Sequence, residues 1–92
     1  MTVQVLDFYA DWCGPCKTQD PILQETIDET EDVELVKVDV DEDQNKANEF
    51  QVRSLPTLVI LKEGAEENEV SDRFVGVTQK EDILTAIENA RQ

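Results

Sequence analysis

The sequence predicts an α/β fold, a mixed four-stranded sheet with helices on both faces, formed by one domain over residues 1–92. Two observations carry this prediction. Segments rich in β-branched and aromatic residues alternate with segments whose apolar residues recur at helical spacing. The resulting order, β-α-β-α-β-β-α, is that of a sheet whose strands are joined mainly through helices.

The first half of the chain is expected to form a strand, a helix, a strand and a short helix, over residues 2–9, 14–30, 34–40 and 43–50. The first strand is rich in β-branched and aromatic residues, which fit a pleated sheet. Pro21 lies inside the long helix and is expected to kink it, because proline removes a backbone donor and clashes with the preceding turn. Ala47 and Phe50 are the predicted apolar contacts of the short helix.

The second half is expected to form two strands and a closing helix, over residues 57–62, 70–75 and 79–90. The first of these strands is almost continuously apolar, as expected for burial on both faces. Thr78 and Glu81 have the spacing of a capping box at the start of the closing helix. The first three strands, joined through helices, are expected to be parallel, and the last two to form an antiparallel hairpin.

The composition is strongly acidic, with 22 Asp and Glu against 8 Lys and Arg, a net charge of −14 and no His. Nucleic acids and anionic membranes are disfavoured as partners, since both require a basic face. The acidic residues are spread along the chain, which favours a solubility role in a very salty interior, where charges are screened within about 3 Å at 1 M salt. We therefore predict a halophilic source.

The N-terminal residues lack the basic start of a signal peptide, and Asp7 interrupts them early. No apolar run approaches the roughly 20 residues that a membrane-spanning helix needs. The cytoplasm is therefore the expected location.

Cys13 and Cys16 stand three positions apart where a strand runs into a helix. Their side chains share one helix face, so the two sulfurs can reach bonding distance. The helix N-terminus favours negative charge, so the pKa of the Cys13 thiol is expected below its ordinary value of about 8.5. Because thiolate is the nucleophile of disulfide exchange, Cys13 is predicted to attack a substrate disulfide and Cys16 to resolve the mixed disulfide. Pro15 fits the first helical turn, and Gly14 allows close approach of a partner chain.

Two other interpretations of the cysteine pair are weaker. A Cys-x-x-Cys pair is often half of a zinc site, but zinc usually has four ligands. The chain has no other Cys and no His, so zinc would require a dimer or carboxylates. Two inert core cysteines at this spacing are less expected still, and we predict no metal and no cofactor.

The cysteine motif and its surroundings resemble the thioredoxin family. The resemblance rests on residues 5–17, 20–23, 36–41, 52–58 and Gly76, nearly the whole chain. The string Trp-Cys-Gly-Pro-Cys is highly specific, since glutaredoxins typically carry Cys-Pro-Tyr-Cys and disulfide isomerases Cys-Gly-His-Cys. The resemblance implies a thioredoxin-like fold and a reductase of disulfide-containing proteins, with electrons from a thioredoxin reductase or an equivalent donor.

The resemblance also implies roles for two charged residues. Asp7 matches the family's buried acid behind the cysteines, which accepts the proton of Cys16 during resolution. Odd-numbered residues of its strand alternate onto one face, so Asp7 is expected among apolar neighbours with a raised pKa. Lys37 matches the lysine that partners this acid from the adjacent strand, although an ordinary exposed strand lysine fits the pattern almost as well.

A docking patch for the substrate follows from the same resemblance. Leu55, Pro56 and Thr57 match the family's cis-proline loop, whose backbone groups pair with an incoming peptide. The alternative for Trp12 is simple packing beside the start of the helix. The expected patch consists of Trp12, Gly14, Pro15, Leu55, Pro56, Val75, Gly76 and Val77.

The chain departs from the family by beginning at the active-site strand, without the usual first strand and helix. Residues 34–40 are therefore expected to form a sheet edge, and residues 43–50 to be the one helix on one sheet face. A monomer is expected, although exposed apolar surface on that face would favour a weak dimer. Residues 63–69 are expected to form an acidic, solvated loop.

Two competing functions are kept beside the reductase. One is a glutaredoxin-like or isomerase-like exchanger, the latter disfavoured because no His lies beside the cysteines. The other is a non-catalytic binding module on the same scaffold, or a zinc-linked dimer.

Overall fold

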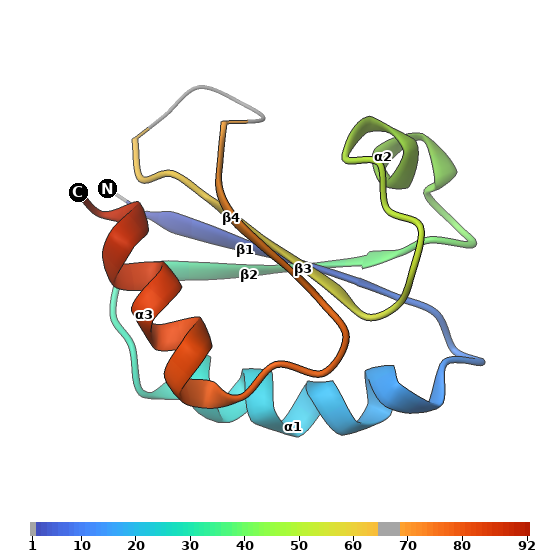
Figure 1. Cartoon of the computed structure of the whole chain (residues 1–92), viewed down its shortest axis with the longest axis horizontal. Helices are drawn as coiled ribbons and strands as arrows, with labels where there is room; N and C mark the ends of the chain where they lie inside the picture. Colours follow the sequence, from blue (N-terminus) through green and yellow to red (C-terminus); the bar gives the residue numbers. More distant parts are fainter. Residues whose placement is uncertain (1, 65–68) are drawn as a thin grey trace.

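The computed structural model describes residues 2–64 and 69–92, and its elements follow the predicted order (Figure 1). In chain order they are β1 (Val3–Tyr9), α1 (Gly14–Asp28), β2 (Val33–Asp39), α2 (Gln44–Glu49), β3 (Thr57–Leu61), β4 (Val70–Val75) and α3 (Lys80–Ala90). Most of the loop expected at residues 63–69 lies outside the described residues. Within the described ranges, no helix is long and apolar enough to cross a membrane.

The sheet has the strand order β2-β1-β3-β4, which confirms that β2 is an edge strand. β1 and β2 are parallel, and β3 and β4 form the expected antiparallel hairpin. The prediction of a third parallel strand was wrong, because β3 pairs antiparallel with β1. Residues 40–56, which connect β2 to β3, include only the six-residue α2 and do not return along the sheet as the 15-residue α1 does between β1 and β2. The chain therefore enters β3 from the end of the sheet at which β1 and β2 finish.

The helices cover both faces of the sheet, as predicted, with α1 and α3 on one face and α2 on the other (Figure 1). Alternate residues of β1 supply the two cores. Val3 and Val5 pack with Leu23 of α1 and with the buried residues of α3. Phe8 packs on the α2 side, its ring centroid 5.7 Å from that of Phe50.

The expected capping box at the start of α3 does not form. The N-cap of α3 is Gln79, and its side chain makes no capping hydrogen bond. The Thr78 hydroxyl instead donates to the Gly76 carbonyl at 3.1 Å. Thr78 is buried, and its backbone amide donates to the side chain of Gln19. The long helix α1 continues through Pro21 and spans Gly14–Asp28.

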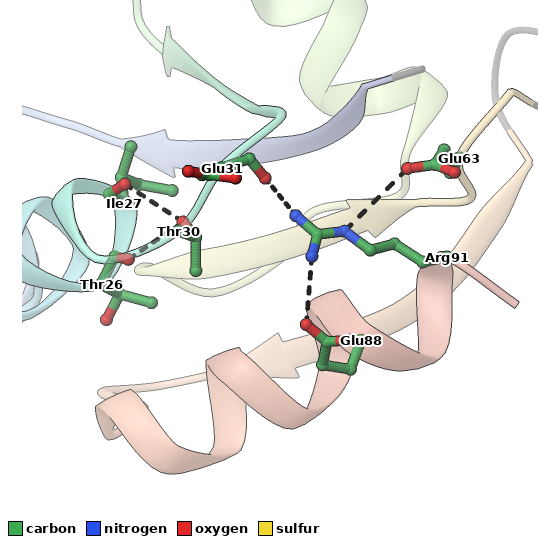
Figure 2. A network of polar contacts seen from close by, with 7 residues as sticks. All are labelled: Thr26, Ile27, Thr30, Glu31, Glu63, Glu88 and Arg91. Atoms are coloured by element: carbon green, nitrogen blue, oxygen red, sulfur yellow. Dashed lines mark hydrogen bonds and ion pairs between the residues drawn. The ribbon is translucent and has the colours of Figure 1, made fainter.

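Arg91, at the C-cap of α3, joins three segments at the end of the sheet away from the cysteines (Figure 2). Its guanidinium forms ion pairs with Glu88 at 3.1 Å and Glu63 at 4.0 Å, and donates to the backbone carbonyl of Glu31. Nearby, the Thr30 hydroxyl donates to backbone carbonyls in the last turn of α1. These contacts hold the ends of α1, β3 and α3 together.

Candidate functional site

Cys13 and Cys16 lie at the start of α1, directly after β1, and are joined by a disulfide. Their Cα atoms are 5.3 Å apart. Cys13 is the N-cap residue, and its Sγ accepts a hydrogen bond from the Cys16 amide at 3.1 Å. An N-cap sulfur faces the unpaired amides of the first helical turn, where negative charge is stabilised. The site therefore provides the electrostatic setting that a thiolate at Cys13 requires.

The loop before β3 lies against the cysteines. The Leu55–Pro56 peptide bond is cis, as the resemblance implied, and Leu55 packs against the cysteine cluster. The Pro56 carbonyl accepts the Gly76 amide at 2.9 Å, so the cis-proline loop and the loop after β4 are bonded side by side. The Thr57 hydroxyl is occupied within the loop, donating to the Ser54 carbonyl at 2.6 Å.

The loop after β4 turns at Gly76, whose φ is +91°, a conformation that residues with a Cβ rarely adopt. A Cβ at this position would meet no atom within 4 Å, so the backbone there is open to an approaching chain. Val75 on one side of the glycine is 64% exposed, and Val77 on the other is also exposed. The loop thus presents two apolar side chains around an accessible backbone.

Trp12 precedes the cysteine pair, and 71% of its surface is exposed. Its indole Nε1 donates to Asp41 Oδ2 at 2.9 Å, which orients the ring without burying it. This exposure argues against simple packing beside the helix start. Gly14 and Pro15 are exposed as well, whereas Pro56 is buried.

Asp7 lies on β1 behind the cysteines and is only 3% exposed. It lines a hollow of about 260 Å³ together with Cys16, Lys17, Asp20 and Lys37. Burial disfavours the charged carboxylate and raises the pKa of Asp7 from 3.8 to about 6. The positive charge of Lys37 opposes this rise, and the negative charge of Asp20 adds to it. The raised pKa predicted from the strand pattern is confirmed.

Lys37 of β2 stands opposite Asp7 in the parallel register, but its ammonium pairs with a different carboxylate. The Lys37 Nζ lies 2.7 Å from Asp20 Oδ1 and 4.9 Å from the centroid of the Tyr9 ring. The hydrogen bond to Asp20 raises the pKa of Lys37. The expected partnership with Asp7 is therefore indirect, because a long lysine side chain keeps its charged end near solvent, where Asp20 is accessible and Asp7 is not.

Sequence reasoning missed two residues of this site, Asp20 and Gln19. Asp20 follows Cys16 by four positions on α1, so helical spacing alone could have placed it near the cysteines. Gln19 is fully buried and hydrogen-bonds the backbone of Thr78. No sequence signal indicated that contact, since its two partners are 59 residues apart.

The site combines a Cys-x-x-Cys disulfide at a helix N-terminus with a cis-proline loop beside it and a buried acid behind it. On this mixed sheet, the combination defines a thiol–disulfide oxidoreductase of the thioredoxin fold. The family model "Thioredoxin" matches residues 2–89. The chain belongs to the thioredoxin family.

Individual thioredoxins agree with this assignment. The thioredoxin of Bacillus subtilis is 46% identical over 80 residues, covering 86% of this chain and 73% of the relative. That of Staphylococcus saprophyticus is 40% identical over 87 residues, covering 94% and 80% respectively. The solved structure of a mutant thioredoxin from Halobacterium salinarum superposes with a TM-score of 0.84 at 37% identity, covering 98% of this chain and 75% of the other.

Proposed function

We propose that the chain reduces protein disulfides with Cys13 as nucleophile and Cys16 as resolving cysteine. The observation that carries this proposal is the hydrogen bond from the Cys16 amide to Cys13 Sγ at the N-terminus of α1. It supports a thiolate at Cys13, the residue that leads into the helix, rather than at Cys16, which lies within the first turn.

The reaction has two exchange steps. The Cys13 thiolate attacks one sulfur of the substrate disulfide, forms a mixed disulfide and releases the other sulfur as a thiolate, which takes a proton from water. Cys16 then loses its proton and attacks Cys13 Sγ, which breaks the mixed disulfide and releases the second substrate thiolate. Two electrons pass to the substrate, and the Cys13–Cys16 disulfide remains. Two electrons and two protons from an external donor, for which we propose a thioredoxin reductase or an equivalent protein, restore the dithiol.

Asp7 is the proposed proton acceptor for Cys16 in the second step. Asp7 and Cys16 line the same hollow, so a proton can pass between them directly or through one water. Its pKa of about 6 leaves the carboxylate mostly ionised at neutral pH, while burial keeps it a stronger base than an exposed aspartate. Lys37 acts on this group through its charge.

The proposed docking patch for the target chain comprises the residues expected from the sequence. Its exposed apolar members, Trp12, Val75 and Val77, offer surface for a target, and the backbone at Gly76 is open. An extended target segment pairs with backbone groups beside Pro56 and places its disulfide over Cys13.

We further propose a cytoplasmic monomer from a halophilic source. The net charge of −14 supports the halophilic source. The proposed reductase activity supports a cytoplasmic location, because the dithiol form of Cys13 and Cys16 is kept available in a reducing compartment. Light scattering in molar KCl tests the oligomeric state, with a dimer mass contradicting this part of the proposal.

The reductase is tested by reduction of a disulfide-bonded protein with dithiothreitol as electron donor, in dilute buffer and in molar KCl. Cys13→Ser is expected to abolish activity, and Cys16→Ser to accumulate a mixed disulfide with the target, because the first step proceeds without the second. Activity that survives Cys13→Ser, or a trapped species formed only by Cys16, would reverse the assignment. Replacing dithiothreitol by glutathione separates a glutaredoxin-like exchanger, which would use it efficiently.

A further inference from the structure

Gln19 is a polar side chain in the core, and both ends of its amide are occupied by a single residue. It lies on α1 three residues after Cys16 and is fully buried. Its Nε2 donates to the Thr78 carbonyl at 3.0 Å, and its Oε1 accepts the Thr78 amide at 2.7 Å. A buried amide must be paired to be tolerated, and here the pairing joins α1 to the loop between β4 and α3.

The hydrogen bonds continue from Thr78 to the cis-proline loop. The Thr78 hydroxyl donates to the Gly76 carbonyl at 3.1 Å, and the Gly76 amide donates to the Pro56 carbonyl at 2.9 Å. A connected line of hydrogen bonds thus runs from the helix that carries the cysteines, through the loop after β4, to Pro56. These are the three segments against which the target chain is proposed to dock.

Apolar packing gives this loop little support. The side chains of Val75 and Val77 on either side of Gly76 are exposed, so they bury little apolar surface there. The side chain of the N-cap Gln79 makes no capping hydrogen bond. The position of the loop relative to Cys13 therefore depends on the amide of Gln19, on the Gly76–Pro56 bond and on the pairing of Val75 with Thr57 at the end of β4.

We propose that Gln19 is a positioning residue for substrate docking, which holds the loop of residues 76–78 in register with Cys13 and Pro56 through its two hydrogen bonds to Thr78. This inference rests on the proposed reductase function. A target disulfide reacts only when its sulfur lies in line with Cys13 Sγ, so a loop shift of about 1 Å weakens productive binding. A small disulfide that needs no contact with the loop is reduced at the wild-type rate even when the loop is displaced.

The test compares Gln19→Met with the wild-type chain and with Leu23→Val. Methionine keeps the length and fills the core but cannot bond Thr78. Leu23 lies on the same helix in the same apolar core, so its substitution loosens packing without touching the loop. We measure kcat and KM for a disulfide-bonded protein and, in parallel, the rate with a small aromatic disulfide. Amide hydrogen exchange at Thr78 and Gly76 reports the loop itself.

Gln19→Met is expected to raise KM for the protein substrate about tenfold with kcat within about twofold. The small disulfide is expected to be reduced at the wild-type rate, and exchange to accelerate at Thr78 and Gly76. Leu23→Val should leave both KM and the exchange of these two amides unchanged. If Gln19→Met does not fold, Gln19→Asn keeps the amide but shortens its reach toward the Thr78 backbone, and it is expected to raise KM about threefold.

Faster exchange at Thr78 with an unchanged KM would overturn the positioning role, since the loop would then be mobile without consequence. An equal loss of rate with both substrates would also overturn it and indicate a structural role. If the wild-type chain reduced the small disulfide but no protein, the proposed reductase function would fail, and this inference with it.

Discussion

Asp7 is a buried carboxyl group whose ionisation the fold opposes, and replacing it by asparagine should change the pH dependence of stability. Its pKa is raised from 3.8 to about 6, chiefly because burial removes water from the carboxylate. At about 1.4 kcal/mol for each pH unit, this difference corresponds to about 3 kcal/mol. The same buried acid that the proposed mechanism uses as a base therefore weakens the folded state at neutral pH.

The sign follows from which state binds the proton. Between about pH 4 and pH 6 the folded chain keeps Asp7 protonated while the unfolded chain has lost that proton. The free energy of unfolding therefore falls as pH rises through this window, by up to about 3 kcal/mol, and Asp7 contributes no further change above it. Asp7→Asn removes this dependence. The free energy of unfolding of the substituted protein should therefore rise relative to that of the wild-type chain as pH rises from 4 to 6.

The assay is urea unfolding of the oxidised protein, at steps of pH from about 3.5 to 8 in about 1 M KCl, which screens the other carboxylates. The quantity of interest is the difference in unfolding free energy between Asp7→Asn and the wild-type chain. Asp28→Asn, on the exposed end of α1, removes the same charge from the surface and serves as control. A difference that is constant with pH, or that grows toward acid, would refute the reasoning.

Three further predictions follow from the same contacts. Asp20→Asn should lower the pKa of Asp7, because it removes a nearby negative charge and releases Lys37 from its ion pair. Carbon NMR of the Asp7 carboxyl group measures this pKa, and a rise would contradict the prediction. Gly76→Ala should destabilise by about 1 kcal/mol through the positive φ alone, since no atom obstructs the new methyl group, and thermal unfolding measures it; an unchanged Tm would show that the loop relaxes freely. Leu23→Ala should cost about 2–5 kcal/mol in urea unfolding, because the fully buried side chain leaves a cavity between α1, α3 and the sheet, and a loss below 1 kcal/mol would indicate that the core collapses around it.

The sequence by itself determined the features that depend on neighbours along the chain. Cys13 and Cys16 are three residues apart at a helix start, so their pairing and their electrostatic setting follow from helix geometry. Alternation along β1 placed Asp7 on the face toward α1 for the same local reason. The element order was also predictable, whereas the edge position of β2 and the cis bond at Pro56 followed only from comparison with the family that the chain resembles.

Tertiary structure decided the features that depend on where distant segments meet. The direction of β3 depends on the end of the sheet to which residues 40–56 lead the chain, and the pattern of apolar residues carries no such information. Lys37 could reach two carboxylates, and the choice of Asp20 depends on which of them lies near solvent. Gln19 and Thr78 are 59 residues apart, and their pairing arises only when α1 packs against the loop before α3. That packing also engages the Thr78 backbone, which pairs with the Gln19 amide as a buried polar group must, while the Thr78 hydroxyl bonds the nearby Gly76 carbonyl and forms no capping box.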